Sequence, residues 1–167
     1  MLRKVTWPVG FADNGKLFLS SMPGRCEPLE IFFREIKDGG VTHVVFLVPD
    51  EEIAKKSPDY LAAIHADDFP AKLWRFEISD FGMPENVVHL ELMLDRIRER
   101  LDAGESVVIH CAAGHGRTGM VATLLLMRMG LRFEAATETI GLAGSGPDTP
   151  EQQAFLRRRE GDYQPGI

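Results

Sequence analysis

Short apolar segments, each rich in β-branched or aromatic residues, recur along the chain and are typical of strands. Glycine, proline and polar residues separate them. Four segments have this pattern and predict strands: Lys16–Ser20, Thr42–Val48, Lys72–Ile78 and Ser106–Ile109. The second and the fourth contain almost only apolar residues, so we expect them to be buried.

Other segments repeat apolar residues every three or four positions, which is the spacing of one helix face. The clearest follows Asn86, a residue type that caps helices, and ends near Gly104. Another, Thr118–Met129, is apolar on nearly every side and is therefore expected at the centre of the protein. Helices are predicted at Pro28–Lys37, Pro58–Ala66, 87–101, Thr118–Met129, Phe133–Gly141 and Pro150–Arg159.

The alternation of strands with helices predicts an α/β fold, with a central, mostly parallel sheet flanked by helices. A chain of 167 residues is the size of one domain. We expect residues 1–160 to share one core. The last segment, Gly161–Ile167, contains two glycines and one proline with little to bury, so it is predicted to be a flexible tail.

Composition and charge exclude several classes of protein. Hydrophobic residues make up 44% and charged residues 26%, so disorder is excluded. A net charge of −6 disfavours nucleic acid and anionic membrane as partners. The longest strongly apolar stretch, Gly119–Met127, is far shorter than the roughly 18 residues that indicate a membrane span. Two cysteines cannot form a disulfide framework, so we expect a cytoplasmic protein with reduced thiols.

The loop after Ser106–Ile109 carries the candidate chemistry. Cys111 directly follows the predicted strand, and Arg117 opens the next helix six residues later. The residues between them are mostly small: Ala112, Ala113, Gly114, His115 and Gly116. Such a loop can turn its backbone N–H groups toward one point, and the helix N-terminus adds partial positive charge. Arg117 can donate to two phosphate oxygens at once, so the loop predicts a phosphate-binding site.

The same positive field favours the thiolate form of Cys111, which can attack phosphorus. Thr118 can donate its hydroxyl to the sulfur when the thiolate later leaves. The alternative of an inert buried cysteine does not explain the arginine and the glycines at this spacing. A zinc site at His110, Cys111 and His115 is rejected because no second cysteine or histidine pair accompanies them. We therefore expect no metal and no cofactor.

With its His-Cys, five residues and Arg-Thr, this loop resembles the signature of the cysteine-dependent protein tyrosine and dual-specificity phosphatases. The resemblance implies the phosphatase fold, a phosphocysteine intermediate formed on Cys111, and phosphate held by Arg117 and the N–H groups of residues 112–117. His110 is expected to anchor the loop through a hydrogen bond of its ring. For the His115 side chain, contact with solvent and contact with substrate remain alternatives.

The segment Asp80-Phe81-Gly82-Met83-Pro84 resembles the loop that carries the general acid of these phosphatases. The resemblance implies that Asp80 protonates the leaving oxygen. Two family residues that often precede the aspartate, tryptophan and proline, are replaced by Ile78 and Ser79. The alternatives are an aspartate that caps a turn and the magnesium-binding motif of kinases, which this chain is too short to contain. Glu85 and Asp67-Asp68 are weaker candidates for the acid.

The resemblance covers nearly the whole chain and is strongest to the kinase-associated phosphatase branch. Leu17–Arg25 is similar to the opening strand and turn of that branch, and Gly141–Phe155 to its closing segment. Gln152 falls on a family glutamine. Asp148 stands where relatives place a glutamine that orients water. It either takes over that role or caps the last helix together with Thr149.

Several functions follow from these features. We expect hydrolysis of phosphotyrosine in a phosphorylated protein substrate, with phosphoserine and phosphothreonine left open. Inositol phosphates or phosphoinositides are the second alternative, and a catalytically weak phosphate-binding module is the third. Arsenate reduction is discounted because that chemistry needs further cysteines. A partner kinase and the oligomeric state are not predicted. Cys26 is either inert or a redox partner of Cys111.

Overall fold

A computed structural model describes residues 1–11 and 14–163 of the chain. One sheet has the strand order β1-β2-β5-β3-β4. Its strands are β1 (Arg3–Lys4), β2 (Lys16–Ser20), β3 (Val41–Phe46), β4 (Lys72–Arg75) and β5 (Ser106–His110). Only β1 runs antiparallel to its neighbour, and the other pairs are parallel. The predicted α/β fold with a mostly parallel sheet is therefore confirmed.

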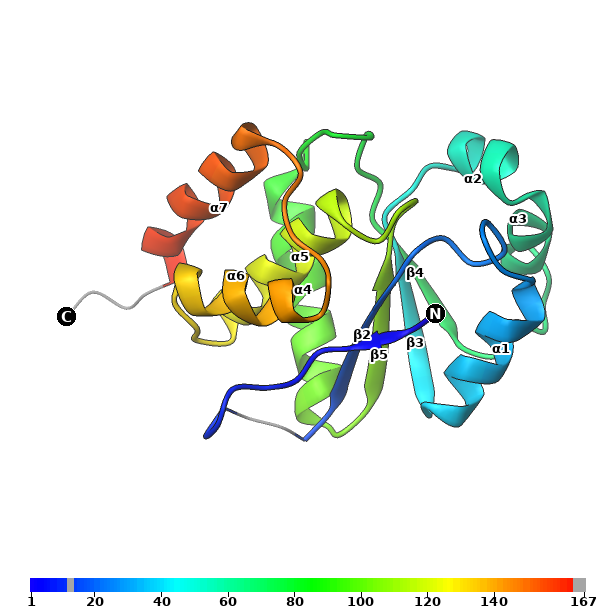
Figure 1. Cartoon of the computed structure of the whole chain (residues 1–167), viewed down its shortest axis with the longest axis horizontal. Helices are drawn as coiled ribbons and strands as arrows, with labels where there is room; N and C mark the ends of the chain where they lie inside the picture. The colour runs from blue at the N-terminus through cyan, green and yellow to red at the C-terminus, as the bar shows by residue number, and fades with distance from the viewer. Residues whose placement is uncertain (12–13, 164–167) are drawn as a thin grey trace.

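Helices cover both faces of this sheet (Figure 1). The helices are α1 (Leu29–Asp38), α2 (Asp50–Lys56), α3 (Pro58–Ile64), α4 (Val87–Asp102), α5 (Gly116–Arg128), α6 (Phe133–Leu142) and α7 (Pro150–Tyr163). The first three lie on one side of the sheet and the last four on the other (Figure 1). In the parts of the chain that the structure describes, no helix is long and apolar enough to span a membrane.

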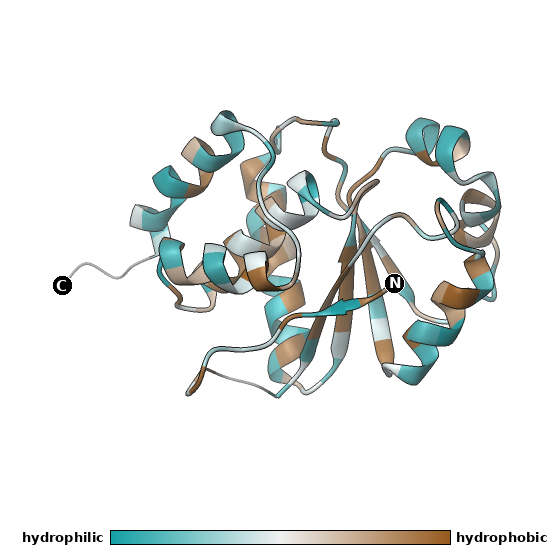
Figure 2. Cartoon of the chain, in the orientation of Figure 1, coloured by the Kyte–Doolittle hydropathy of each residue, from teal (hydrophilic) through white to brown (hydrophobic). Residues whose placement is uncertain are grey.

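The main core lies between the sheet and α5. Every residue of α5 from Gly116 to Met127 is buried, which confirms the predicted central helix. Ile109 on β5 and Leu94 on α4 pack into the same cluster and are fully buried. Hydrophobic residues follow the strands and the inner helices, whereas hydrophilic residues gather on outer helices such as α7 (Figure 2). The strand and the helix that flank the Cys111 loop are therefore held firmly.

Two elements escaped the sequence prediction. The strand β1 is only two residues long and joins the sheet at its edge. The helix α2 has a single buried residue, Ile53, so no apolar periodicity marks it. Three acidic residues in its first turn and two lysines in its last are the remaining sequence signal, because such charges complement the helix dipole.

Several predicted boundaries were wrong. The strand β3 ends at Phe46 rather than Val48, and the helix α3 ends at Ile64 rather than Ala66. The strand β4 ends at Arg75 rather than Ile78. Beyond that end, the N–H groups of Phe76 and Ile78 still donate to the carbonyls of Phe46 and Leu47. The helix α5 begins two residues earlier than predicted, at Gly116. The helix α7 continues through Tyr163, so residues 161–163 of the predicted tail are helical. The remainder of that predicted tail, 164–167, lies outside the described residues.

Candidate active site

Cys111 occupies the first position after β5, at the carboxyl end of the central strand. Its side chain is almost fully buried, with 3% exposed. The N–H of Gly114 donates to the Cys111 sulfur across 3.3 Å. The loop therefore curls back over the sulfur before α5 begins at Gly116, as the sequence predicts.

Gly114 allows the loop to make this turn. Its φ of 77° lies in the left-handed region, and a Cβ there would come within 2.6 Å of the Ser20 carbonyl oxygen. The Gly114 carbonyl accepts from Arg3 Nη2 at 2.6 Å and from the Ser145 hydroxyl at 2.9 Å. Arg3 and Ser145 thus support the loop from distant parts of the chain, and sequence reasoning missed both.

Several backbone N–H groups of the loop are available to a ligand. Among the described residues, those of Ala112, Ala113 and His115 donate to no protein acceptor. Together with the first turn of α5, these groups form the kind of cradle that binds phosphate. The His115 side chain is exposed and does not line the pocket at Cys111, which favours the solvent alternative for this side chain.

Arg117 lies beside Cys111 with only 2% of its residue exposed. Its Nη1 donates to the Ile78 carbonyl at 3.0 Å, and both terminal nitrogens bind Glu52, at 2.8 and 2.9 Å. Burial lowers the pKa of Arg117, but the hydrogen bonds to Glu52 and the nearby negative charges outweigh it and raise that pKa overall. The hydrogen bond from Arg117 contributes most to lowering the pKa of Glu52, to about 2. The guanidinium is thus held in place as a permanent cation.

Asp80 reaches the same guanidinium from the loop before α4. Its Oδ1 lies 3.2 Å from Arg117 Nη2 and accepts the N–H of Phe81 at 3.1 Å. The Asp80 side chain is 52% exposed. Phe81 has a φ of 56°, a conformation that residues other than glycine seldom adopt. The structure therefore brings the predicted acid within reach of the predicted phosphate cradle.

A pocket of about 180 Å³ opens at this point. Its lining includes the predicted nucleophile, acid and arginine together with parts of the loop between them. The full lining is Arg25, Lys56, Asp80, Phe81, Cys111, Ala112, Ala113, Gly116, Arg117 and Asp148. Arg25 and Lys56 add two cations that were not among the predicted site residues.

Asp148 turns toward the loop. Its Oδ2 accepts the N–H of Gly116 at 2.9 Å, and a side chain at Gly116 would collide with this carboxylate. The cap of α7 is Thr149, whose hydroxyl accepts the Gln152 N–H at 3.1 Å. The alternative in which Asp148 shares that capping role is therefore wrong, because its carboxylate binds the loop instead.

Gln152 joins three parts of the site. Its side-chain oxygen accepts the N–H of Asp148 at 2.8 Å, and its Nε2 donates to the Gly82 carbonyl at 3.0 Å. The side chain thus connects α7 to the loop that carries Asp80. The fully buried position of Gln152 agrees with a structural role of this kind.

His110 supports the loop from beneath. Its Nδ1 lies 3.0 Å from the Cys111 carbonyl and its Nε2 lies 2.7 Å from the Tyr60 hydroxyl. Burial lowers the pKa of His110 to about 4, so the ring is neutral at pH 7. A carbonyl can only accept, so Nδ1 carries the proton and Tyr60 donates to Nε2. The predicted ring hydrogen bond is present.

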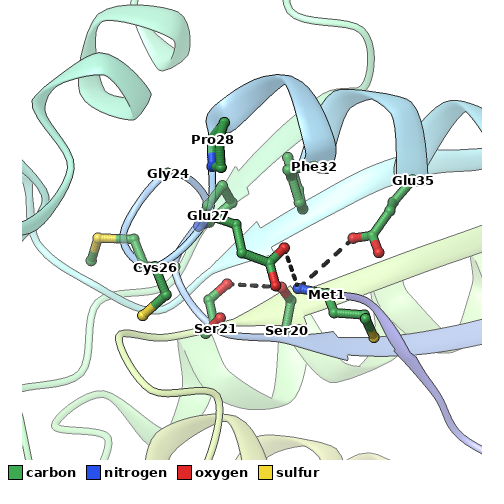
Figure 3. Close-up of a pocket in the computed structure, with 11 residues that line it drawn as sticks. Met1, Ser20, Ser21, Gly24, Cys26, Glu27, Pro28, Phe32 and Glu35 are labelled. Atoms are coloured by element: carbon green, nitrogen blue, oxygen red, sulfur yellow. Dashed lines mark hydrogen bonds and ion pairs between the residues drawn. The ribbon is translucent and has the colours of Figure 1, made fainter.

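The Thr118 hydroxyl and the Cys26 thiol differ in where they lie. The Thr118 hydroxyl is buried and has no hydrogen-bond partner among residues 1–11 and 14–163. Cys26 is an exposed free thiol that lines a different, small pocket with Met1 and Glu27 (Figure 3). Within the described part of the chain, no cluster of three or more histidine, cysteine or acidic residues is placed to hold a metal ion.

The buried Cys111 thiol lies at the carboxyl end of a parallel sheet, beside the fixed guanidinium of Arg117 and the convergent N–H groups of the loop. The carboxyl group of Asp80 approaches from a neighbouring loop. This is the arrangement of a cysteine-dependent phosphatase. The comparisons with known proteins agree. A family model described as "Polymorphic toxin system, DSP-PTPase phosphatase" matches residues 20–131, and the chain belongs to this family. The resemblance inferred from the sequence is thereby confirmed.

Individual relatives extend over most of the chain. Protein tyrosine phosphatase type IVA 2 of Mus musculus is 27% identical over 154 residues, which cover 90% of this chain and 86% of the relative. The structure of Tk-PTP in its active form has a TM-score of 0.70 and 27% identity, covering 95% of this chain and all of that one.

Two further structures share the fold at lower identity. Kinase-associated phosphatase, with its catalytic cysteine substituted by serine, has a TM-score of 0.76 at 18% identity and covers 91% of this chain and 89% of that one. PTPMT1 in complex with PI(5)P has a TM-score of 0.69 at 17% identity and covers 92% of this chain and 94% of that one.

Proposed function

We propose that this phosphatase hydrolyses phosphotyrosine in a protein substrate through a phosphocysteine intermediate. The observation that carries the proposal is the meeting of Cys111, Arg117 and Asp80 in one pocket beside unoccupied N–H donors. Phe81 lines the same pocket with 65% of its residue exposed. An exposed aromatic ring there can pack against the ring of a phosphotyrosine.

In the first step, the Cys111 thiolate attacks phosphorus and the bond from phosphorus to the tyrosine oxygen breaks. Asp80 gives a proton to that oxygen. Arg117 and the free N–H groups of Ala112, Ala113 and His115 bind the other three phosphate oxygens, where charge gathers in the transition state. Because Glu52 binds both terminal nitrogens of Arg117, the guanidinium needs little reorientation to meet the substrate.

In the second step, water attacks phosphorus, the bond from phosphorus to sulfur breaks, and Asp80 accepts the proton of the water. The otherwise unpaired hydroxyl of Thr118 stabilises the thiolate as it leaves. Asp148 lies at the edge of the phosphate cradle, where its carboxylate can position the water. Its negative charge opposes a negatively charged intermediate, so we expect this step to be slower than the first.

Inositol phosphates are the second candidate substrate class, because the PTPMT1 structure that shares this fold binds PI(5)P. A headgroup with several phosphates needs several cations around the cradle. Arg25, Lys56 and Arg117 line the pocket, but Asp80 and Asp148 line it too, and Glu52 pairs with both Lys56 and Arg117. Among the described residues this leaves Arg25 alone for a further anionic group, too few cations for a headgroup with several phosphates, which supports the phosphotyrosine peptide as the substrate.

The test compares p-nitrophenyl phosphate, phosphotyrosine and phosphoserine peptides, and an inositol phosphate, each with and without EDTA. We expect hydrolysis of the phosphotyrosine peptide with the highest kcat/KM, and no effect of EDTA. A higher kcat/KM for the inositol phosphate would move the protein to the second class. Phosphate binding without turnover would indicate a phosphate-binding module.

We further propose that the protein acts in the cytoplasm. Cys111 is a free thiol that must remain reduced to attack phosphorus, and Cys26 is also free. Localisation of a fluorescently tagged chain in intact cells tests this, and export of the tagged protein would contradict it.

A further inference from the structure

Positive charges in the active-site pocket differ in their partners. The pocket is lined by three cations, Arg117, Lys56 and Arg25. Glu52 pairs with the first two, across 2.8 Å to Arg117 and 2.6 Å to Lys56. Arg25, by contrast, has no carboxylate within 4.0 Å among the residues that the structure describes. It is the one pocket cation there whose charge the protein does not neutralise.

The turn that carries Arg25 is anchored at two places. On one side, the N–H of Met22 donates to the Ala112 carbonyl in the phosphate loop at 3.0 Å. On the other, the Ser57 hydroxyl donates to the Pro23 carbonyl at 2.7 Å. Gly24, directly before Arg25, has a φ of 74°, and a Cβ there would collide with the Ser57 hydroxyl. The backbone at Arg25 is therefore fixed at the rim of the pocket.

A second, smaller pocket is lined by other residues of the same turn, and Arg25 is not among them. There Cys26 and Glu27 lie near Met1, and the carboxylates of Glu27 and Glu35 point toward the amino group of Met1, at 3.5 and 3.8 Å (Figure 3). The acidic side chains of this segment thus have a partner of their own, away from Arg25.

We propose that Arg25 determines substrate specificity by binding a second anionic group, a carboxylate or a phosphate, on the residue next to the phosphotyrosine. The proposal rests on the proposed phosphotyrosine activity. The scissile phosphate already has Arg117 and the N–H groups of the loop, so the cation at the rim is available to a neighbouring group. A guanidinium suits this role because it binds carboxylate and phosphate with two parallel hydrogen bonds.

The experiment measures kcat/KM at low ionic strength for phosphotyrosine peptides that differ only in the adjacent residue: Glu, Gln, Lys or phosphoserine. For the wild type, we expect kcat/KM to be about threefold higher for the Glu peptide than for the Gln peptide, which is the effect of one exposed ion pair. The advantage of the phosphoserine peptide over the Gln peptide should be larger. In Arg25→Gln the preference should disappear, and in Arg25→Glu it should invert toward Lys. Added salt should reduce the wild-type preference.

Arg34 provides the matched control, since it is exposed on α1 and does not line the pocket. Arg34→Gln and Arg34→Glu should keep the wild-type preference, and thermal melting checks that every variant is folded. An unchanged Glu-to-Gln ratio in Arg25→Glu would overturn the proposal. So would an equal loss on both peptides and on p-nitrophenyl phosphate, which would assign Arg25 to the scissile phosphate. If no phosphopeptide is hydrolysed while p-nitrophenyl phosphate is, the proposed function fails first and this proposal falls with it.

Discussion

The phosphate loop (residues 111–117) and the acid loop (residues 78–85) meet in one pocket but differ in how they are held. Cys111 and Arg117 are 3% and 2% exposed, and other segments hydrogen-bond the phosphate loop from several sides. In the acid loop, Asp80 has a 52% exposed side chain. That loop is held to the rest of the site through Arg117 and through Gln152.

This difference indicates that the two loops have different roles. The phosphate loop is preorganised, so its N–H groups and guanidinium lose little conformational freedom when phosphate binds. The acid loop has fewer fixed contacts and contributes one proton transfer. We therefore expect substitutions in the phosphate loop to cost more activity than those in the acid loop.

The largest effect is expected for Cys111→Ser. A serine hydroxyl stays protonated in the same position and is a poor nucleophile, so kcat should fall by at least about 10⁴ while vanadate still binds. Steady-state assays with p-nitrophenyl phosphate and vanadate titration measure both, with Cys26→Ser as the control thiol. Activity within tenfold of the wild type would contradict the covalent mechanism.

Arg117→Lys should be nearly as damaging as Arg117→Ala, with kcat/KM lower by about 10³. Lysine keeps the positive charge but lacks the planar guanidinium, whose two terminal nitrogens Glu52 holds in one orientation. Kinetics of the two variants on the same phosphopeptide give the comparison. If lysine restored most of the activity, positive charge alone would explain phosphate binding.

Asp80→Asn should reduce kcat by about 10² on alkyl phosphates and less on p-nitrophenyl phosphate, because a good leaving group needs little protonation. The matched control is Asp38→Asn, which changes an exposed aspartate on α1, outside the pocket. Equal losses on both substrates would place the acid elsewhere, and Glu85 would be the next candidate.

Stability should depend on pH through His110, beneath the phosphate loop. Its pKa in the folded protein is about 4, below the ordinary value of 6.5, so protonation favours the unfolded chain. The stabilisation is complete above pH 6.5 and is lost as the pH falls toward 4, up to about 3 kcal/mol. Urea unfolding between pH 7 and 4.5 measures this before Glu52 protonates.

His110→Gln should reduce that pH dependence and leave the part due to His43, whose pKa burial also lowers. His65→Gln, which changes an exposed histidine, should leave the dependence as in the wild type. If His110→Gln kept the full slope between pH 7 and 4.5, another group would be responsible for it.

The smallest effect is expected for Gln152→Ala, which removes two hydrogen bonds, one of them to the acid loop. If the looser acid loop raises the activation free energy by about 1 kcal/mol, kcat falls about fivefold on alkyl phosphates. Gln153→Ala, an exposed neighbour on the same helix, is the control. Equal activity of the two variants would show that the acid loop does not depend on this contact.

Local sequence predicted the phosphate loop well because all of its parts are within eight residues of one another. Cys111, the small residues, Arg117 and the following apolar helix determine the strand–loop–helix geometry by themselves. The hydrogen bond from His110 to the Cys111 carbonyl was likewise predictable, since the two residues are neighbours.

The long-range partners could not be predicted in this way. Glu52 is 65 residues from Arg117 and lies on a short helix with one buried residue, so neither periodicity nor spacing relates it to the site. Gln152 and Gly82 are 70 residues apart. The contact of Asp148 with Gly116 depends on how the chain returns to α5, which no local pattern encodes.

The support of Gly114 has a consequence for the order of folding. Its carbonyl accepts one hydrogen bond from Arg3, 111 residues earlier, and one from Ser145, 31 residues later. While the chain is being synthesised, Cys111 and Arg117 leave the ribosome before Ser145 does. The hydrogen bond from Ser145 that supports the phosphate loop therefore forms only after the segment around Ser145 has docked, and in refolding experiments enzyme activity should return later than the far-ultraviolet signal of the helices.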